Sequence, residues 1–341
     1  MMEFQINKLK EAGEMFTNAT ILVTGGTGSW GYDLVKKLLT YNPKEIIVYS
    51  RNEDKQVNMR REFDDSRLTF SLGDVRDRQA LFYAFKGIDY VFHLAALKHV
   101  PVCEELPLEA VKTNVIGTQN VIDAAIYNGV KKVINVSTDK AADPANFYGF
   151  TKAIGEKLIV HANSLSKDTK FICIRGGNVL ATNGSVVNLF IDEINNKNKI
   201  SITDKRMTRF FLTMEDAINL LLKAASEGIG GEIFVMKMPS CRIMDLAKVL
   251  INHFGKKVSI VESGIRPGEK LNEVLLASNE IEDTVEFDKD YLVVLPKIEI
   301  KGLREHYSAF PSVKTTSYSS SDKFLTHEEI RKMLVKAKVL K

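Results

Sequence analysis

The residues with the clearest chemical meaning lie between positions 137 and 152. Ser137-Thr138-Asp139-Lys140 follows an apolar run that predicts a strand, and Tyr148 and Lys152 come next in a segment that predicts a helix. Residues four apart project from the same face of a helix. An ammonium beside a phenol stabilises the phenolate and lowers its pKa, so a tyrosine there can act as a base. Asp139 and Lys140 add more proton-transfer groups than a simple alcohol dehydrogenase needs.

A glycine-rich loop near the amino terminus predicts a dinucleotide site. It stands between a β-rich run at 20–24 and a helical pattern from residue 32. In that order, Gly25 permits a tight turn, Gly28 lets the backbone approach a pyrophosphate, and Gly31 lets helix and strand pack closely. The pyrophosphate would rest on the free N–H groups of the helix amino terminus. The candidate contacts in the loop are Gly25, Thr27, Gly28, Ser29, Trp30 and Gly31.

The end of the next predicted strand favours NADP over NAD. An NAD site usually places Asp or Glu there to bind the ribose hydroxyl. Ser50, Arg51 and Lys55 instead offer a hydroxyl and cations that suit a 2′-phosphate. The segments after the third and fourth predicted strands add Asp74 and Val75 at the adenine, and Ala95 and Ala96 where small side chains let the backbone pass close to the cofactor. His93, within an apolar strand, is expected to be a packed core residue.

Length and patterning predict an α/β protein with a doubly wound parallel Rossmann sheet and a smaller α/β substrate-binding lobe. The 341 residues can bury a large core, and strands alternate with helices through about residue 175. We assign 1–16 to an amino-terminal helical arm, 17–175 to the nucleotide-binding domain and 176–300 mainly to the substrate lobe, with segments near 205–230 returning to the first domain. Residues 301–341 are expected to form a carboxy-terminal arm, extended over 311–322, and a short helix that begins with a capping box at Thr326 and Glu329.

Composition narrows the classes of function. The net charge of +4, from 47 basic and 43 acidic residues, is too balanced to suggest nucleic-acid binding. Six histidines and three cysteines show no metal-ligand spacing, so we expect no metal site. With no signal peptide and no apolar 18-residue span, the sequence favours the cytoplasm and no membrane insertion.

Taken together, these motifs resemble the extended short-chain dehydrogenase/reductases, and more narrowly the inverting UDP-N-acetylglucosamine 4,6-dehydratases of surface-sugar pathways. The resemblance covers roughly residues 15 to 290. Besides the glycine loop and Tyr148-x-x-x-Lys152, the segments that carry it are 73–75, 95–101, 114–118, 137–142, 175–179, 207–210 and 266–270. One capsule-pathway branch of these enzymes has methionine at the position of Tyr148, whereas this chain has the tyrosine. The carboxy-terminal region of this chain is nevertheless more similar to that branch.

The resemblance implies an internal redox cycle with tightly bound NADP. Tyr148 would take the C4-hydroxyl proton while a hydride passes to NADP. Lys140, which must be neutral to act as a base, would then transfer the C5 proton. Asp139 would act as the acid for the departing C6 hydroxyl. Enzymes of this type that keep the C5 configuration carry Asp-Glu where this chain has Asp139-Lys140, so inversion at C5 is expected. Thr138 and Lys152 complete the implied catalytic set.

The resemblance also implies partners: a UDP-sugar substrate and further copies of the chain in a homo-oligomer. Arg209 and Arg266 are candidates for the pyrophosphate because a planar guanidinium can hold two phosphate oxygens. Glu269 and Asn178 would bind ribose or sugar hydroxyls. The remaining implied contacts are Lys98 for both cofactor and substrate, Asn114 for the cofactor, and Ser185 and Val186 at a helix amino terminus that could receive a phosphate.

Two other functions fit part of the pattern. A UDP-sugar 4-epimerase on the same scaffold needs Tyr148, Lys152 and Thr138 but has no use for Asp139-Lys140 beside the cofactor. An inactive NADP-binding scaffold is the other alternative, and the intact set of catalytic side chains argues against it.

Overall fold

The computed structural model describes residues 13–182 and 184–340, and most of the predicted arm at 1–16 lies outside this range. The first half alternates strands with helices. Its elements are β1 (Thr20–Thr24), α2 (Ser29–Leu39), β2 (Glu45–Ser50), α3 (Glu53–Phe63), β3 (Leu68–Leu72), α4 (Arg78–Ala84), β4 (Tyr90–His93), α5 (Val100–Glu105), α6 (Pro107–Ala110), a π-helix (Val111–Ile116), α7 (Gly117–Tyr127), β5 (Lys132–Thr138), a 3-10 turn (Asp139–Ala141), α8 (Phe147–Leu165) and β6 (Lys170–Gly176).

The second half is more irregular. Its elements are β7 (Asn178–Val179), α9 (Val186–Asn196), β8 (Lys199–Ile202), β9 (Thr208–Leu212), α10 (Met214–Glu227), β10 (Ile233–Met236), β11 (Ser240–Arg242), α11 (Ile243–Phe254), β12 (Ser259–Glu262), β13 (Val274–Leu276), a 3-10 turn (Ser278–Asp283), β14 (Thr284–Glu286), β15 (Tyr291–Val294), α12 (Leu303–Tyr307), β16 (Tyr318–Ser319) and α13 (His327–Lys336).

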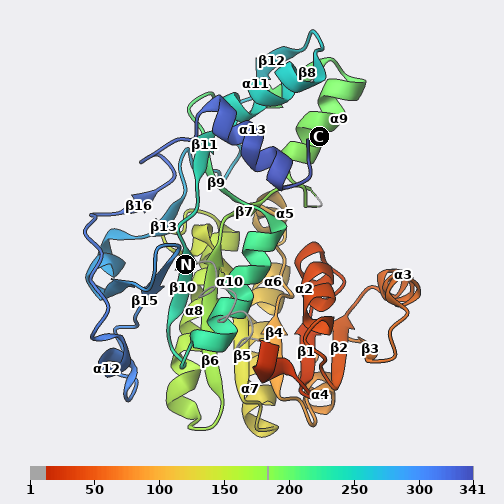
Figure 1. Ribbon diagram of the computed structural model, residues 1–341, viewed down its shortest axis with the longest axis vertical. Helices are drawn as coiled ribbons and strands as arrows, with labels where there is room; N and C mark the ends of the chain where they lie inside the picture. The colour runs from red at the N-terminus through yellow and green to blue at the C-terminus, as the bar shows by residue number, and fades with distance from the viewer. Residues whose placement is uncertain (1–12, 183, 341) are drawn as a thin grey trace.

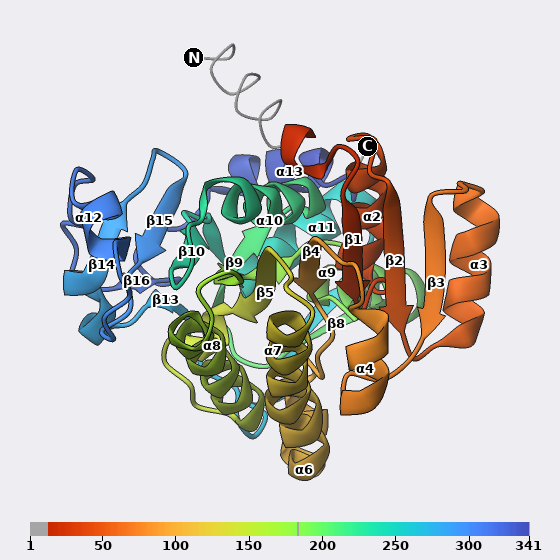
Figure 2. The same ribbon diagram turned by 90° about the horizontal axis from the view of Figure 1, so that it is seen from below.

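A nine-stranded sheet organises the larger body, in the order β14-β15-β10-β6-β5-β4-β1-β2-β3. The strands from β3 to β10 are parallel, and β15 and β14 continue the sheet in antiparallel pairing. Helices α2 and α10 cover one face, while α4, α7 and α8 cover the other (Figures 1 and 2). Central strands such as β1 are buried throughout because both faces are covered. The predicted doubly wound parallel sheet is confirmed.

A smaller lobe packs α9, α11 and α13 with two small sheets, β8-β12 and β7-β9-β11 (upper part of Figure 1). Within the range 176–300, helix α10 lies on the large sheet, where segments near 205–230 were expected, and β10, β14 and β15 are further strands of that sheet. The three strands continue the large sheet beyond β6.

The carboxy-terminal segment is tied to the rest of the chain. Residues 318–319 pair with β13, and the following Ser320 is fully buried, with its backbone and hydroxyl hydrogen-bonded within the chain. Helix α13 begins with the predicted capping box of Thr326 and Glu329 and packs against α11. At the other end of the described chain, Phe16 is buried against Tyr90 and Phe92.

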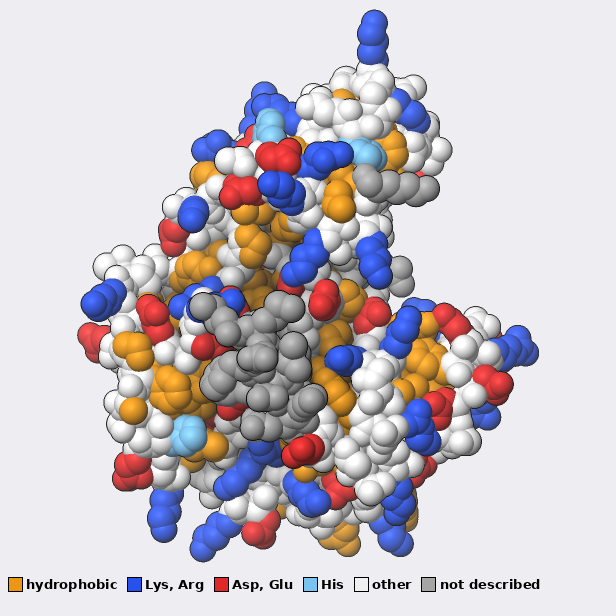
Figure 3. Space-filling model, viewed as in Figure 1, with side chains coloured by type: hydrophobic (Ala, Val, Ile, Leu, Met, Phe, Trp, Pro, Cys, Tyr) orange, Lys and Arg blue, Asp and Glu red, His pale blue; other side chains and the backbone are white. Residues whose placement is uncertain are grey.

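Basic and acidic side chains are interspersed over the face seen in Figure 3, in keeping with the small net charge. Within residues 13–182 and 184–340, none of the helices combines the length and the apolar character needed to cross a bilayer.

Candidate active site

The glycine loop has the shape that a dinucleotide requires. Gly25 has a positive φ of 68°, and a Cβ there would meet the backbone N of Ala95 at 2.8 Å. A Cβ on Gly31 would lie 2.5 Å from the backbone of Gly26, so α2 could not pack against the loop with a larger residue. Gly28 is the N-cap of α2 without a side-chain cap, which leaves N–H groups for a phosphate. Thr27 and Ser29 flank Gly28, and these residues fit a nicotinamide dinucleotide.

The residues predicted to read the adenosine end lie together. Arg51 follows β2 with an exposed side chain, 3.6 Å from Asp74 after β3. Asp74 also accepts from Arg76 at 2.6 Å, and this pairing lowers its pKa against the opposing effect of burial. Ser50 is buried and its hydroxyl accepts from Gln56. Lys55 is exposed in the first turn of α3, and Val75 is buried in the core.

Asn114 organises the segment after β4. Its Oδ1 accepts from the backbone N–H of Leu97 at 2.8 Å, and its Nδ2 donates to Leu97 O at 2.9 Å. Nδ2 also donates to Thr151 on α8. Asn114 therefore fixes the loop that carries Ala95, Ala96 and Lys98, and burial lowers the pKa of Lys98.

His93 is a core residue, as expected. Its ring nitrogens lie 2.8 Å from the Thr24 hydroxyl and 3.2 Å from the Thr118 hydroxyl. Burial, followed by the charge of Lys152, lowers the pKa of His93 to about 3. The imidazole is neutral and ties β1, β4 and α7 together.

The proton-transfer residues converge where β5 ends. The Thr138 hydroxyl donates to Asp139 Oδ1 at 2.8 Å, and Lys140 Nζ lies 3.0 Å from the same oxygen. Asp139 is 1% exposed, and its Oδ2 has no hydrogen-bond partner among the described residues. Tyr148, in the first turn of α8, faces this group through interactions with Thr138 and Lys140.

The pKa of Tyr148 is raised, and not lowered as the sequence predicted. Burial raises the pKa of Tyr148 to about 12, and the cation that opposes this rise is Lys140 rather than Lys152. Lys152 is buried deeper in α8, where burial lowers its pKa and the groups that oppose this are Cys173 and Glu156. Helical spacing correctly placed the two side chains on one face, but the charge next to the phenol comes from the turn after β5.

Lys140, which has to be neutral to act as a base, is held in its charged form by its neighbours. Burial lowers the pKa of Lys140, but the carboxylates of Asp139 and Glu273 outweigh burial and hold the pKa at about 12. Lys140 Nζ lies 3.4 Å from Glu273 Oε1, and Arg209 Nε lies 3.7 Å from that oxygen. We call these four residues, Asp139, Lys140, Glu273 and Arg209, the lysine cluster.

Four of the predicted substrate residues lie in two segments, the start of α9 and the loop around Gly268. Ser185 is the N-cap of α9, its hydroxyl is buried without a partner among the described residues, and Val186 begins the helix. The neighbouring Gly184 packs against His99, next to Lys98. Arg266 and Glu269 lie on a loop that is tied to the start of α8, because Asn146 Nδ2 donates to Gly268 O at 2.9 Å.

Arg209 and Asn178 hold more interior positions. Arg209 is 7% exposed, and its Nη1 donates to the carbonyls of Thr208 and Leu271, so part of the guanidinium is already engaged. Asn178 is partly buried on β7, opposite Phe211 of β9. Trp30 packs beside Gly176 at the end of β6.

The sequence pattern did not identify two buried features. The first is Glu273, which stands three positions after the motif at 266–270. An acidic residue so close to that motif was an available signal. The other is Arg175 with Glu156 and Glu280, which we call the arginine cluster. All five N–H donors of Arg175 are used, by Glu156 at 2.9 and 2.7 Å, by Glu280 at 2.7 Å twice, and by Leu275 O at 3.1 Å.

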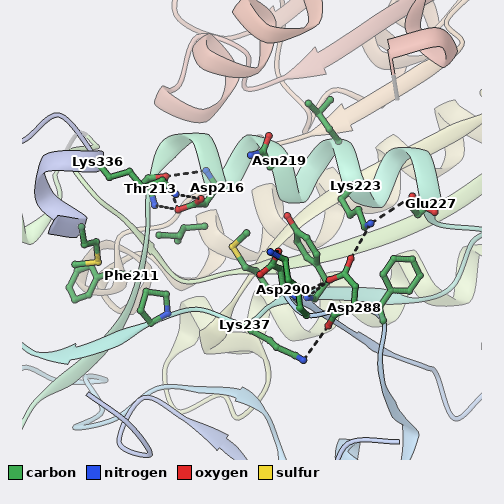
Figure 4. A pocket seen from close by; sticks show the side chains of 18 of the residues that line it. Phe211, Thr213, Asp216, Asn219, Lys223, Glu227, Lys237, Asp288, Asp290 and Lys336 are labelled. Atoms are coloured by element: carbon green, nitrogen blue, oxygen red, sulfur yellow. Dashed lines mark hydrogen bonds and ion pairs between the residues drawn. The ribbon is translucent and has the colours of Figure 1, made fainter. Parts of the chain in front are cut away.

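A large cavity lies away from these residues. It has a volume of about 1220 Å³ and runs between α10, the β10–β15 edge of the sheet and α13 (Figure 4). Lys223, Lys237 and Asp288 point toward its interior. Because α10 covers the sheet face opposite α8, this cavity is separate from the catalytic candidates.

The parallel sheet, the glycine loop and the Tyr148-Lys152 pair on α8 define an extended short-chain dehydrogenase/reductase. A family model described as polysaccharide biosynthesis protein matches residues 21–295. The chain belongs to this family.

The chain is 44% identical over 298 residues to the inverting UDP-N-acetylglucosamine 4,6-dehydratase of Campylobacter jejuni subsp. jejuni serotype O:23/36 (strain 81-176), which covers 86% of this chain and 88% of that protein. It is 46% identical over 273 residues to a UDP-glucose 4-epimerase of Rickettsia prowazekii (strain Madrid E), covering 78% and 80%. The X-ray structure of Pen from Bacillus thuringiensis superimposes with a TM-score of 0.89 at 36% identity, over 96% of this chain and 99% of that one.

Proposed function

We propose that this protein is a sugar-nucleotide 4,6-dehydratase that acts on UDP-N-acetylglucosamine and inverts C5. The observation that carries this proposal is the placement of Asp139 and Lys140, 3.0 Å apart, beside the hydroxyl of Tyr148. Oxidation at C4 needs Tyr148 alone as the base, whereas elimination across C5 and C6 needs a second base and an acid. The similarity to the Campylobacter dehydratase supports the same substrate and stereochemistry.

NADP is the proposed cofactor, held by the glycine loop with Ser50, Arg51 and Lys55 at the 2′-phosphate. When bound, NADP would supply the hydride acceptor for oxidation at C4 of the sugar and the hydride donor for reduction at C6. The absence of an acidic residue at the end of β2, where Ser50 and Arg51 stand, supports NADP over NAD. Release of the cofactor by denaturation, followed by chromatography, distinguishes the two.

The side chains divide the proton transfers. Tyr148 takes the proton of the C4 hydroxyl, and the Thr138 hydrogen bond and the Lys140 ammonium favour its phenolate. Lys140 removes the C5 proton, which the new C4 ketone acidifies. Asp139 protonates the departing C6 hydroxyl once it carries the proton that was taken from the C4 hydroxyl, and that proton leaves in water. C5 receives a proton from the opposite face.

A UDP-sugar 4-epimerase is the second candidate, supported by the similarity to the Rickettsia protein. Proton NMR of the protein with UDP-N-acetylglucosamine in D₂O separates the two functions. A 4-keto-6-deoxy product with deuterium at C5 is expected, and its ring couplings report inversion. UDP-N-acetylgalactosamine without solvent deuterium would instead establish epimerisation, and no turnover of this or other sugar nucleotides would leave an inactive scaffold.

The proposal also includes a reducing cytoplasm and self-association. The three cysteines, Cys103, Cys173 and Cys241, are buried and free. Leu108 on α6 is 63% exposed, and Phe150 and Ile154 on α8 are 49% and 47% exposed. Because α6 and α8 are in contact, these apolar side chains offer a surface for a second copy of the chain. Light scattering coupled to gel filtration measures the number of copies.

A further inference from the structure

The lysine cluster contains a carboxylate to which the proposed chemistry gives no task. Glu273 directly precedes β13 and is 2% exposed. Its Oε1 lies 3.4 Å from Lys140 Nζ and 3.7 Å from Arg209 Nε. Its Oε2 is buried and has no hydrogen-bond partner in the described part of the chain. One oxygen therefore holds the catalytic lysine while the other is left unsatisfied, which is costly for a buried carboxylate.

The backbone of Glu273 is held firmly. Its N–H donates to the hydroxyl of Ser320 at 2.9 Å, and its carbonyl accepts from the N–H of Ser320 at 2.8 Å. The Ser320 hydroxyl in turn lies 2.6 Å from the hydroxyl of Thr208. The carboxy-terminal segment thus fixes the carboxylate against Lys140 from outside the Rossmann sheet.

This arrangement bears on the protonation of Lys140. A lysine removes a proton from C5 only as the neutral amine, yet here the ammonium is stabilised between two carboxylates. Its side chain is 16% exposed, and bound substrate would cover what remains. The proton that Lys140 must lose therefore needs an acceptor inside the site.

We propose that Glu273 is a positioning residue that accepts this proton, so that Lys140 becomes a neutral amine next to C5 of the sugar. The inference rests on the proposed dehydratase function. A proton passes from Lys140 Nζ to the Glu273 carboxylate, which turns an ammonium–carboxylate pair into an amine and a carboxylic acid with no change in net charge. Lys140 then takes the C5 proton, and Glu273 keeps its proton until the amine is free again.

The charges around Glu273 act on this exchange in both directions. Lys140, Asp139, Arg209 and Lys270 face its carboxylate, and Tyr148 faces Lys140 from α8. Burial raises the pKa of Glu273, and Asp139 raises it further, while the three cations oppose them. A buried carboxyl with a raised pKa is a better proton acceptor than a solvated one.

The exchange has a consequence for pH dependence. When Glu273 takes the proton, the reactive pair contains as many protons as the resting pair, so its population does not change with pH across the neutral range. Without the carboxylate, Lys140 must lose its proton to solvent, and the amine then becomes about tenfold more abundant with each pH unit.

The test follows exchange of the C5 proton with D₂O, by NMR, between about pH 6 and pH 8, in the 4-keto-6-deoxy sugar nucleotide that keeps the C5 configuration of UDP-N-acetylglucosamine, because its C5 proton lies on the face at which Lys140 acts. Starting from this ketone bypasses oxidation at C4, so Tyr148 does not limit the rate. The proteins compared are the wild type, Glu273→Gln, Glu273→Asp and a matched control, Glu262→Gln, whose carboxylate is exposed on β12. Melting temperatures and the amount of copurified cofactor report the folding of each variant.

We expect a flat profile for the wild type, for Glu262→Gln and, at a lower rate, for Glu273→Asp. Glu273→Gln should show a rate that rises about tenfold per pH unit. A flat profile for Glu273→Gln, or identical profiles for Glu273→Gln and Glu273→Asp, would overturn the inference. If Glu273→Gln does not fold, a unit slope in the wild type alone overturns it. Failure of the wild type to form any 4-keto-6-deoxy product would reject the dehydratase function instead.

Discussion

The two buried charge clusters differ in how fully their polar atoms are paired. In the arginine cluster, all donors of Arg175 have partners, and the residues join β6, α8 and the turn after β13. In the lysine cluster, Asp139 Oδ2 and Glu273 Oε2 are buried without partners among the described residues. A fully paired cluster has one stable arrangement, whereas spare acceptors allow protons and substrate hydroxyls to be exchanged. We therefore expect the arginine cluster to stabilise the fold and the lysine cluster to take part in the reaction.

The largest effect is expected from Lys140→Met. Loss of the C5 base should reduce dehydration by about 10²- to 10⁴-fold, the usual contribution of a general base. The melting temperature should change little, because the side chain is partly exposed and the neighbouring carboxyls can bind protons. NMR turnover and thermal unfolding measure both, with Lys157→Met, exposed on α8, as the control. If Lys140→Met lowers the melting temperature strongly while its folded fraction keeps full activity, the lysine cluster has a structural role and not a chemical one.

Glu156→Gln should act mainly on stability. It leaves the buried guanidinium of Arg175 incompletely neutralised, and breaking such a pair costs about 3 kcal/mol or more in the free energy of unfolding. The folded fraction should keep its C5 exchange. Urea unfolding compared with Glu282→Gln, an exposed carboxylate two positions after Glu280, measures the difference. A change of less than about 0.5 kcal/mol would show that the arginine cluster is not an architectural element.

His93 extends the comparison, because both of its ring nitrogens have hydrogen-bond partners and it is therefore expected to stabilise the fold. Its pKa is about 3 in the folded protein and about 6.5 when unfolded, so the unfolded chain binds an extra proton between these values. Stability should consequently fall by about 1.4 kcal/mol per pH unit as the pH decreases from 6.5. His93→Gln should remove this part of the slope, whereas His161→Gln, exposed on α8, should retain it. Parallel slopes for the two variants would contradict the prediction.

Ser320→Ala should have the smallest effect. The substitution removes the hydrogen bonds to Glu273 N and the Thr208 hydroxyl and should lower stability by about 1 kcal/mol. A few-fold loss of C5 exchange should accompany it, because the carboxylate of Glu273 is then held less firmly against Lys140. Ser321→Ala, exposed next to it, serves as the control. Identical exchange rates for the two variants would show that the carboxy-terminal segment does not position the carboxylate of Glu273.

Local sequence determined much of the nucleotide-binding half. The glycine loop predicted a tight turn at Gly25 and close packing at Gly31, and the folded chain has no room for a Cβ at either position. Apolar runs predicted the parallel strands, and the capping box correctly placed the start of α13. These features depend on neighbouring residues, so spacing alone contains the required information. The choice of NADP and the roles of the individual site residues remain predictions.

The tertiary structure alone decided the electrostatics of the site. Glu273, Arg209 and Ser320 come from segments far from Lys140 in the chain, and neither strand nor helix periodicity relates their positions. The sequence predicted a lowered pKa for Tyr148, whereas burial raises it, and the carboxylates of Asp139 and Glu273 raise the pKa of Lys140 against the effect of burial. Spacing fixes the direction of a side chain within one element. A pKa depends on burial and on distances between elements, and these exist only in the folded chain.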